Sequence, residues 1–400
     1  MKPGWKCSKL GDLLQRTETI DPTKKPIEEF LYIDVSSVDN QRFEIMTAQN
    51  ILGKNAPSRA RKLILSNDII FATVRPTLKR IAIVPEKFDK QICSTGFVVL
   101  RPKPIILSRY LYYFLQSDKF ISKMQEVQNG TSYPAVTDTQ VKEQNVVYPP
   151  LADQQRIVAF LDQALSAIDT VKANTEKSLL QVHQVFQTFL QNIFNNPGLG
   201  WEEKRISEIS TIKGGKRVPK GYRLKTNFTG HPYIRVTDFT DSGTIELSDI
   251  HYIDNDVFEI IKNYTISTND LYISIAGTIG KTGIVPPELN NANLTENACK
   301  LVFIKNIDPK FVYFFTKTQN FIDQAGLNTR TTAMPKLALT RLATIKLFIP
   351  PSISDQKEVV EKAETLNSET IRVEEIYKQK LKLLSDLKQS ILHKAFSGEL

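Results

Sequence analysis

Basic and hydroxyl side chains gather in a few short polar stretches, the parts of the sequence best suited to bind an anion. Residues 54–62 and 213–225 mix lysine and arginine with turn-forming residues, as exposed loops do. Residues 75–80 follow an apolar run, and residues 129–134 and 329–335 are polar runs that end in proline. Ammonium, guanidinium, hydroxyl and amide groups contact DNA phosphates and read base edges. DNA contacts are therefore predicted for Lys54, Arg59, Arg61, Lys62, Arg75, Thr77, Lys79, Arg80, Thr131, Ser132, Lys213, Lys216, Arg217, Lys220, Arg223, Thr278, Lys281, Arg330 and Thr331.

The distribution of charge supports a polyanionic ligand. The 400 residues carry a formal net charge of +9. Lys and Arg outnumber Asp and Glu by 7 in residues 1–150 and by 4 in residues 196–354, whereas residues 151–195 and 355–400 each carry one excess acidic residue. A basic domain most often binds nucleic acid, although modest basicity alone is weak evidence. A solvated surface without a ligand explains any single basic residue equally well, but explains the whole set less well.

A glycine-rich stretch, residues 275–282, suggests a different chemistry, the binding of nucleotide phosphates. The phosphate-binding loop of nucleotide-binding proteins needs glycine where Ile275 stands, and a helix after the Gly-Lys-Thr end. Residues 283–287 (Gly-Ile-Val-Pro-Pro) instead predict a strand that ends in prolines. The stretch is therefore not interpreted as a nucleotide site.

No motif of a catalytic or metal centre occurs in the sequence. It lacks the Gly-x-Gly-x-x-Gly signature of dinucleotide-binding proteins and the Asn/Asp-Pro-Pro-Tyr/Phe motif of amino-methyltransferases. Its cysteines and histidines are scattered, so metal ligands are not expected and the cysteines are predicted to be reduced thiols. Catalytic residues are not expected either, although a site assembled from distant residues stays open. The scattered residues are Cys7, Cys93, Cys299, His183, His231, His251 and His393.

The sequence also predicts where the protein is found. With 41% hydrophobic and 24% charged residues, the composition is that of a globular protein with more than one domain. No run of about 18 apolar residues occurs, and residues 1–7 lack the apolar segment of a signal peptide. We expect no membrane association and a cytoplasmic location.

The basic segments alternate with two long stretches of helical type, residues 151–195 and 354–400. Each follows a pair of prolines and then runs for about 40 residues without a helix breaker. Apolar residues recur in steps of four and three, which predicts a heptad seam along each helix, although two ordinary amphipathic helices packed on their own domains are the alternative. The middle positions Thr175, Ser178, Thr370 and Lys380 are polar, so neither helix is expected to be stable alone. The predicted seams are Ile157, Leu161, Ala164, Ile168, Val171, Val182, Val185 and Phe189, and Val359, Ala363, Leu366, Val373, Tyr377, Leu384, Leu387 and Ile391.

The chain repeats once, with a period near 200 residues. Residues 75–80 take the place of residues 276–281 in this repeat. Short β-branched runs predict strands, and residues 108–122 and 309–323 predict helices whose aromatic residues lie in the core: Tyr112, Tyr113, Phe114, Phe314 and Phe315. The matched segments are 5–12 with 201–208, 32–38 with 233–239, 67–73 with 269–275, 83–86 with 284–288, 93–100 with 296–303, and 110–115 with 311–316.

The expected fold class is α+β. It consists of two tandem α/β domains (1–150 and 196–353) and two long helices (151–195 and 354–400) that pack as an antiparallel coiled coil, with a pseudo-twofold internal repeat. Helices of about 40 residues are about 60 Å long, so they would hold the basic domains apart, each facing a major-groove segment of DNA. The repeat makes the step from Leu400 to Trp5 equivalent to the step from Phe194 to Trp201, so the termini should lie close together.

Three motifs give the chain a resemblance to a known family. They are residues 277–286 (Gly-Thr-Ile-Gly-Lys-Thr-Gly-Ile-Val-Pro), the Pro-Pro-x-x-x-x-Gln openings of both long helices, and residues 387–400, which end in Ala-Phe-Ser-Gly-Glu-Leu. Over essentially its whole length, the chain resembles the DNA specificity subunit of type I restriction–modification systems. Residues 75–80 (Arg-Pro-Thr-Leu-Lys-Arg) depart from the Gly-Thr-Ile-Gly-Lys form, as expected if the two domains read different sequences.

The resemblance implies a non-catalytic reader of double-stranded DNA. Each target-recognition domain would bind one half of a split, asymmetric target, and the long helices would act as a spacer. Two methyltransferase (modification) subunits would dock on these helices, and restriction subunits would join the full complex. No cofactor is expected in this chain, because S-adenosylmethionine and ATP with Mg would bind in the partner subunits. The alternatives are a coiled-coil scaffold with two protein- or carbohydrate-binding domains, and a self-contained methyltransferase.

Overall fold

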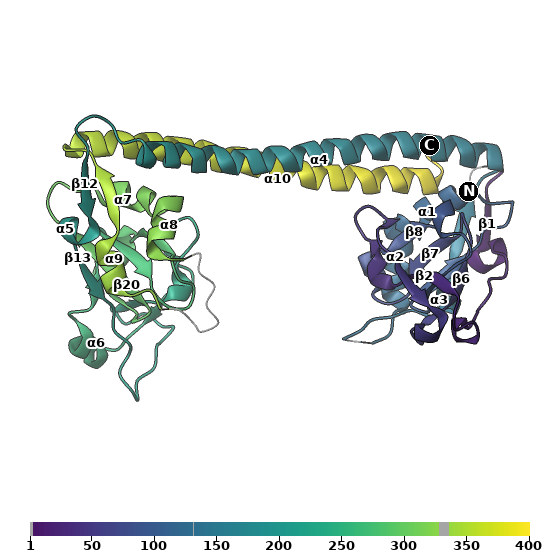
Figure 1. The fold of residues 1–400 in the computed structure, drawn as a ribbon, viewed down its shortest axis with the longest axis horizontal. Coiled ribbons are helices and arrows are strands. Elements are labelled where there is room, and N and C mark those ends of the chain that lie inside the picture. The colour runs from purple at the N-terminus through teal and green to yellow at the C-terminus, as the bar shows by residue number, and fades with distance from the viewer. Residues whose placement is uncertain (1–2, 131, 328–335) are drawn as a thin grey trace. The chain divides into compact units, whose positions relative to one another are not determined.

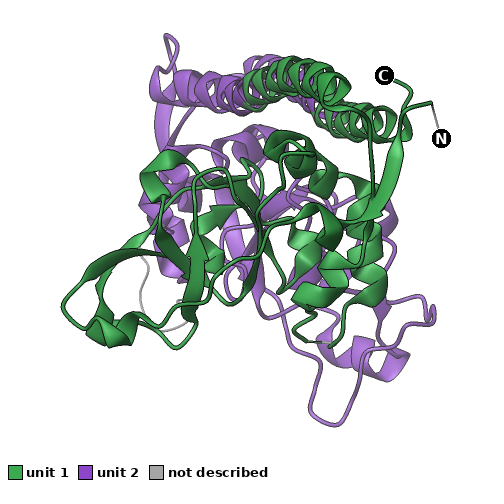
Figure 2. Ribbon diagram, turned by 90° about the vertical axis from the view of Figure 1, so that its right-hand side faces the viewer, with its two compact units in different colours: residues 1–176, 378–400 green, residues 177–377 purple. Residues whose placement is uncertain are grey.

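A computed structural model describes residues 3–130, 132–327 and 336–400. Internal contacts divide the chain into two compact units (Figure 2). Unit 1 consists of Met1–Glu176 and Lys378–Leu400, and unit 2 consists of Lys177–Tyr377. The long helices α4 (Leu151–Asn195) and α10 (Ile353–Ser397) are each continuous across the division, so both units contain one part of each helix (Figure 1).

Unit 1 is built on two sheets that share a core. One sheet has the strand order β5-β2-β9-β6 and the other β10-β7-β8, and β1 pairs with β11 beside them. The strands are β1 (Lys6–Lys9), β2 (Glu29–Ile33), β3 (Val38–Asp39), β4 (Glu44–Ile45), β5 (Gln49–Leu52), β6 (Ala60–Ile64), β7 (Ile69–Ala72), β8 (Ile81–Ile83), β9 (Gln91–Ser94), β10 (Phe97–Leu100) and β11 (Asn145–Tyr148). The shorter helices are α1 (Ser108–Gln116), α2 (Asp118–Val127) and α3 (Asp138–Lys142), with 3-10 turns η1 (Leu10–Leu13), η2 (Pro22–Lys24), η3 (Val35–Ser37), η4 (Gly53–Asn55), η5 (Pro76–Leu78) and η6 (Glu86–Phe88).

Unit 2 repeats this plan with sheets β15-β14-β19-β16 and β13-β20-β17-β18 and the pair β12-β21. Its strands are β12 (Glu202–Arg205), β13 (Ser210–Gly214), β14 (Pro232–Ile234), β15 (His251–Tyr252), β16 (Thr265–Ile266), β17 (Asp270–Ser274), β18 (Thr282–Ile284), β19 (Ala292–Leu294), β20 (Ala298–Phe303) and β21 (Lys346–Ile349). Its helices are α5 (Ile206–Ile209), α6 (Asn255–Ile261), α7 (Pro309–Phe315), α8 (Gln319–Ala325) and α9 (Leu339–Thr344), with 3-10 turns η7 (Val236–Asp238) and η8 (Pro287–Leu289).

The internal repeat is confirmed by strand pairing. In each unit one parallel pair, β2 with β9 and β14 with β19, sits among antiparallel neighbours. The predicted match of residues 93–100 with 296–303 is wrong by two residues. The pairing of Ile33 with Cys93 corresponds to that of Ile234 with Leu294. Because side chains alternate across a strand with period 2, a two-residue error leaves the inward and outward pattern unchanged and cannot be seen in the sequence.

Both aromatic segments are helical, as predicted, but each is divided into two helices. The Ser117 hydroxyl accepts a hydrogen bond from the Phe120 amide at the start of α2, and Thr318 caps α8 in the same way. Such side-chain caps satisfy the first amides of a new helix and so favour a break in the preceding one. Four of the five predicted aromatic residues are buried and Tyr112 is half-buried, which confirms a core role rather than a base-stacking one.

Within each unit the two long helices pack antiparallel. In unit 1 the beginning of α4 and the end of α10 share a core cluster that includes Leu161 and Leu392. In unit 2 the end of α4 and the beginning of α10 share another, which includes Leu190 and Ala363. The expected antiparallel helix pair is therefore confirmed inside each unit, where the helices also form part of the domain core.

The heptad seam is correct at one of its two positions and wrong at the other. At the first position Leu161, Ile168 and Ala363 are buried as predicted. At the second, Ile157 is buried, but Val171, Val185 and Leu387 are 38%, 53% and 48% exposed. The second position falls one residue later, where the buried Leu165 replaces Ala164, Phe186 replaces Val185, and Lys388 replaces Leu387. The exposed Lys380 is likewise replaced by the half-buried Leu381, whereas Ser178 and Leu179 are both half-buried. Steps of four-three and three-four have the same average, so the apolar pattern does not fix the phase.

A buried glutamine at the start of each long helix explains the double-proline motif. The Gln154 side chain donates to the carbonyls of Pro149 (2.9 Å) and Ile105 (3.1 Å) and accepts from the Leu107 amide (2.9 Å). Gln356 makes the equivalent three bonds, to Pro350 (3.3 Å), Asn306 (3.0 Å) and the Asp308 amide (2.9 Å). The first helix thus uses Gln154 and not Gln155, so the two motifs differ in spacing by one residue.

The two termini lie close together, as predicted (Figures 1 and 2). Trp5 and Leu400 both pack against the first core cluster of unit 1, and the Arg156 guanidinium donates to the Leu400 carbonyl at 3.3 Å. Among the described helices, none combines the length and apolar character needed to cross a membrane.

Candidate nucleic-acid interface

Backbone hydrogen bonds bring several predicted loops of unit 1 together. The Arg75 amide donates to the Pro134 carbonyl (2.7 Å), which joins the loop after β7 to the polar loop before α3. The Thr73 amide donates to Gly96 (2.8 Å), and the Thr95 amide donates to Arg59 (2.8 Å). We call residues 59, 73–77, 95–96 and 132–135 loop cluster 1. It places the exposed side chains of Arg59, Arg75, Thr77 and Ser132 on one part of the unit.

Arg75 is the most constrained of the exposed residues in loop cluster 1. Its backbone is left-handed (φ +50°), a conformation that costs a residue with a side chain of order 1 kcal/mol and concentrates at functional sites. Its guanidinium lies 5.0 Å from the ring centroid of Tyr133, which is itself 73% exposed. The cation–π contact restricts the exposed guanidinium to one side of the Tyr133 ring. Such an arginine is ready to donate two parallel hydrogen bonds to a base edge.

The other predicted basic residues of unit 1 differ in how far they are used inside the protein. Lys54 is exposed in η4. Lys62 binds Asp138 (2.6 Å) and the Phe97 carbonyl, and Lys79 binds Asp118 (3.0 Å). Arg61 lies 3.6 Å from Asp21, and Arg80 donates to the carbonyls of Val35 and Val38. The structure thus gives Arg61, Lys62, Lys79 and Arg80 internal partners that a DNA contact would have to share or replace.

Unit 2 assembles an equivalent cluster from equivalent loops. The Ile275 amide donates to the Asn297 carbonyl (2.8 Å), and the Leu337 amide donates to the Ile275 carbonyl (2.9 Å). The Lys216 amide donates to the Leu294 carbonyl (2.8 Å), which adds the end of β13. We call residues 215–217, 275–278, 294–297 and 336–337 loop cluster 2. It exposes Lys216, Arg217 and Thr278.

Most predicted basic residues of unit 2 are exposed. Lys213 lies on β13, and Lys220 and Arg223 lie on the loop that follows it. The Lys216 ammonium lies 5.6 Å from the ring centroid of Tyr264, and Arg217 binds Glu296 (2.5 Å). These side chains can approach a phosphate backbone without the loss of a buried contact.

Lys281 is the exception, because it has an internal structural role. Its ammonium binds Asp241 (2.9 Å) and the Phe239 carbonyl (3.1 Å). The strand register makes Lys281 the equivalent of Arg80, which donates to the carbonyl of Val38, the equivalent of Phe239. A basic residue after the loop therefore ties it to the 3-10 turn in both units.

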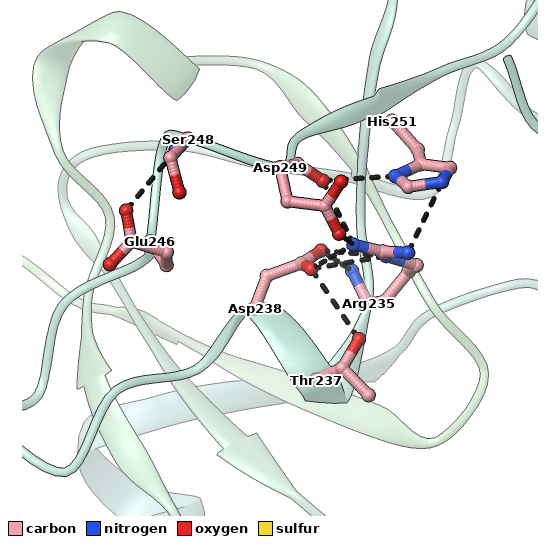
Figure 3. A network of polar contacts seen from close by, with 7 residues as sticks. All are labelled: Arg235, Thr237, Asp238, Glu246, Ser248, Asp249 and His251. Atoms are coloured by element: carbon pink, nitrogen blue, oxygen red, sulfur yellow. Dashed lines mark hydrogen bonds and ion pairs between the residues drawn. The ribbon is translucent and has the colours of Figure 1, made fainter. Parts of the chain in front are cut away.

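A polar network fixes the adjoining loop of unit 2, residues 239–251 (Figure 3). The Arg235 guanidinium binds the buried Asp238 (2.6 Å) and the exposed Asp249 (3.0 Å) and lies 3.3 Å from the Nε2 atom of His251. Both carboxylates hold the pKa of Arg235 above its usual value, although partial burial works against them. Arg235 therefore joins Asp238, at the end of the 3-10 turn η7, to Asp249, near the end of this loop.

Comparison with known proteins identifies the family. The sequence model of the "type I restriction modification DNA specificity domain" matches residues 2–181 and again residues 199–383. The chain is 23% identical to the EcoKI specificity subunit of Escherichia coli, covering 92% of this chain and 82% of that protein, and 20% identical to the MjaIX specificity subunit of Methanocaldococcus jannaschii, covering 99% and 93%.

Solved structures agree with the sequence match. A chain from a study of "complex assembly and conformational transition of the type I R-M system" has a TM-score of 0.89 at 28% identity and covers 100% of this chain and 99% of its own. The HsdS subunit of Thermoanaerobacter tengcongensis has a TM-score of 0.65 at 28% identity, with 100% and 98% covered. The chain belongs to the type I restriction–modification DNA specificity family.

The two family-domain matches coincide with the internal repeat, so each loop cluster belongs to one copy of a DNA specificity domain. The described residues were also compared with the requirements of a metal site, a reactive thiol and a nucleotide-binding loop. Within residues 3–130, 132–327 and 336–400, no group of three or more His, Cys, Asp or Glu side chains is placed to hold a metal. All three cysteines are free, and burial raises the pKa of Cys93 and of Cys299 to about 12. The loop after Ile275 leads into strand β18, as predicted, and not into a helix.

Three predicted contact residues, Thr131, Arg330 and Thr331, lie outside the described residues. Two residues beside the predicted ones were missed. Tyr133 could have been singled out, because it is an aromatic residue within a polar run. Glu296 could not, because the two-residue error in the repeat matched it with Cys93, on a strand, instead of with Thr95 on the turn of loop cluster 1.

Proposed function

We propose that this protein is the DNA-reading subunit of a type I restriction–modification complex, and that each unit reads one half of a split, asymmetric target in double-stranded DNA. One observation carries the proposal: two units of one fold build loop clusters from three pairs of equivalent backbone segments, 73–77 with 275–278, 95–96 with 294–297 and 132–135 with 336–337, but equip the clusters with different side chains. Arg75 and Tyr133 mark the first cluster, and Arg217 and Glu296 mark the second. Two domains of the same fold that present different hydrogen-bond donors and acceptors on their loop clusters are suited to reading two different half-sites.

The reader is proposed to be non-catalytic and to work with partner subunits. Both long helices carry exposed apolar side chains, including Leu180 (64%), Val185 (53%), Leu383 (58%) and Leu387 (48%). Val185 and Leu387 stand at equivalent positions of the repeat, so each helix exposes an apolar side chain there, whereas Leu180 and Leu383 correspond to Lys382 and Gln181. Such exposed apolar residues suit two copies of one partner, here the methyltransferase subunits, and restriction subunits would join the full complex. S-adenosylmethionine and ATP with Mg would bind in these partners, and the site of action would be the cytoplasm, with its DNA.

A salt titration of DNA binding tests the proposal. The chain, assembled with its methyltransferase subunits, is titrated with a duplex that contains the target, from about 50 to 200 mM salt. If six or more phosphates are contacted, the affinity should fall by about three orders of magnitude. The methyltransferase subunits without this chain serve as the control. Binding that is absent, or that does not depend on this chain or on salt, would favour the protein- or carbohydrate-binding scaffold. Binding of S-adenosylmethionine by the chain alone would instead favour a self-contained methyltransferase.

A further inference from the structure

Loop cluster 2 presents a fixed donor–acceptor pair. The Nε atom of Arg217 lies 2.5 Å from the Oε1 atom of Glu296, and the two side chains are 77% and 25% exposed. The Thr295 hydroxyl donates to the other carboxylate oxygen at 3.1 Å. Burial raises the pKa of the Glu296 carboxyl, but the bond from Arg217 outweighs it with the help of local hydrogen bonds, and the pKa is lowered overall. Glu296 is therefore an ionised acceptor, and Arg217 keeps its terminal N–H donors available.

The backbone dictates that these two side chains meet. A Cβ atom on Gly215 would lie 2.1 Å from the Thr295 carbonyl oxygen and 2.4 Å from that of Leu294, so only glycine allows the end of β13 to pass this close to the turn. The Lys216 amide then binds the Leu294 carbonyl. Two residues after the glycine, Arg217 stands beside Glu296. The pair is thus built into the fold of the cluster and is more than a chance surface contact.

The order of groups on this pair matches one kind of base pair. In the major groove a G·C pair presents two acceptors, N7 and O6 of guanine, followed by a donor, the N4 amino group of cytosine. We propose that Arg217 and Glu296 together read one G·C pair, with the arginine donating to guanine and the carboxylate accepting from cytosine. This assignment rests on the proposed function, because it presupposes that loop cluster 2 faces DNA.

The same pair rejects the alternatives. An A·T pair presents acceptor, donor and acceptor, so the second donor of Arg217 would face the adenine amino group and Glu296 would face the O4 acceptor of thymine. A donor that faces a donor, or a charged acceptor that faces an acceptor, weakens binding more than the loss of one hydrogen bond does. A reversed C·G pair puts its donor where the arginine donates. Unit 1 has Thr95 in the place of Glu296, so this acceptor belongs to unit 2 only.

The experiment uses the complex with methyltransferase subunits and begins with genome-wide methylation mapping. The wild-type chain yields the two half-sites, and Arg75→Ala shows which of them belongs to unit 1. The other half-site should contain a G·C pair whose identity is required. Binding of duplexes is then measured with that guanine replaced by 7-deazaguanine, or its cytosine by a pyrimidinone that lacks the N4 amino group. Each replacement should weaken wild-type binding about 10- to 100-fold.

The variants decide the assignment. Arg217→Ala should lose its sensitivity to 7-deazaguanine, and Glu296→Ala should lose its preference for cytosine with the N4 amino group, because alanine removes the acceptor. Both variants should still require the unit 1 half-site, which shows that they fold. Arg223 is an exposed residue on the loop that follows β13. Arg223→Ala is therefore the matched control, and its DNA binding should stay sensitive to both replacements. Variants as sensitive as the wild type, or a unit 2 half-site without a required G·C pair, would overturn the inference alone. Absence of any chain-dependent split methylation would overturn the proposed function with it.

Discussion

The interior of unit 1 and that of unit 2 use the same chemistry, whereas their loop clusters do not. Asp68 binds Arg101 (2.9 Å), and the equivalent Asp270 binds Lys300 (2.7 Å), although the strand register makes Val302 the counterpart of Arg101. Both acidic residues are buried, and a buried carboxylate needs such a partner. The glutamine anchors of the long helices are also repeated. The buried carboxylates and the glutamine anchors therefore recur at equivalent positions, while the basic partner of each carboxylate differs.

The loop clusters follow the opposite rule. Arg75 is held by an aromatic ring through a cation–π contact, and Arg217 by a carboxylate through an ion pair. The two arginines also come from different segments, the loop after β7 and the end of β13. Two domains that read different DNA sequences independently need the same fold but different side chains on their loop clusters. Four predictions test this contrast, from the largest expected effect to the smallest.

The glutamine anchors should matter equally in both units. Gln154→Ala leaves one amide and two carbonyls without their partners, which at about 1 kcal/mol or more per group lowers the free energy of unfolding by about 3 kcal/mol. Gln356→Ala should do the same in unit 2. Calorimetry should show a Tm lowered by several degrees for either variant, and by much less for the exposed neighbour Gln155→Ala. A large effect in one unit only would mean that the two frames are not equivalent.

Exposed basic residues outside the pairs should act through phosphates. Lys220→Ala and Arg223→Ala in unit 2 should each weaken DNA binding a few-fold and reduce the slope of log affinity against log salt by about 1, because each removes one neutralised phosphate. The methylated sequence should not change. An altered half-site in either variant would place that residue on a base edge instead.

The ring of Tyr133 should sharpen the reading of the unit 1 half-site. Tyr133→Ala removes a cation–π contact of about 0.5–1 kcal/mol, so Arg75 becomes mobile and discrimination should fall two- to five-fold at the position that it reads. Tyr133→Phe keeps the ring and should stay close to the wild type, which makes it the matched control. If both substitutions act alike, the hydroxyl and not the ring is what contributes.

Moving the chain termini should have the smallest effect. A circular permutant that joins Leu400 to Trp5 through a short linker and opens at Asn196–Pro197, an exposed connection, should keep its Tm within a few degrees and still assemble with methyltransferase subunits. The closeness of the termini in unit 1 is the physical reason. A permutant that fails to fold would show that the order of synthesis of the two units matters.

The fold could be predicted from the sequence because the patterns that indicate it extend over many residues. Two helices of 45 residues and a repeat of about 200 residues leave strong periodic patterns. Its errors were short shifts that no pattern resolves. The match of residues 93–100 slipped by two because strands alternate with period 2, and the helix seam slipped by one where Ala164 and Leu165 are both apolar. The motif glutamine was assigned to Gln155 instead of Gln154 for the same reason, because two glutamines stand side by side.

The candidate site was predicted less completely. Basic loops can be recognised from their amino-acid composition. Arg59, Arg75, Lys220 and Arg223 are exposed, which agrees with their prediction as loop residues. Which of the basic residues are tied up inside the protein, as Arg80 is, depends on carbonyl groups contributed by distant segments. The companion residues Tyr133 and Glu296 depend on tertiary contacts in the same way.

The independence of the two units can be tested directly by genome-wide methylation mapping with the wild-type chain, Arg75→Ala and Arg217→Ala. The wild type should give a split, asymmetric motif. Arg75→Ala should relax one or two positions of one half-site, Arg217→Ala should relax positions only in the other, and the spacing between the halves should stay the same in both. Relaxation of both half-sites by either variant, or of the same half-site by both, would contradict the assignment of one half-site to each unit.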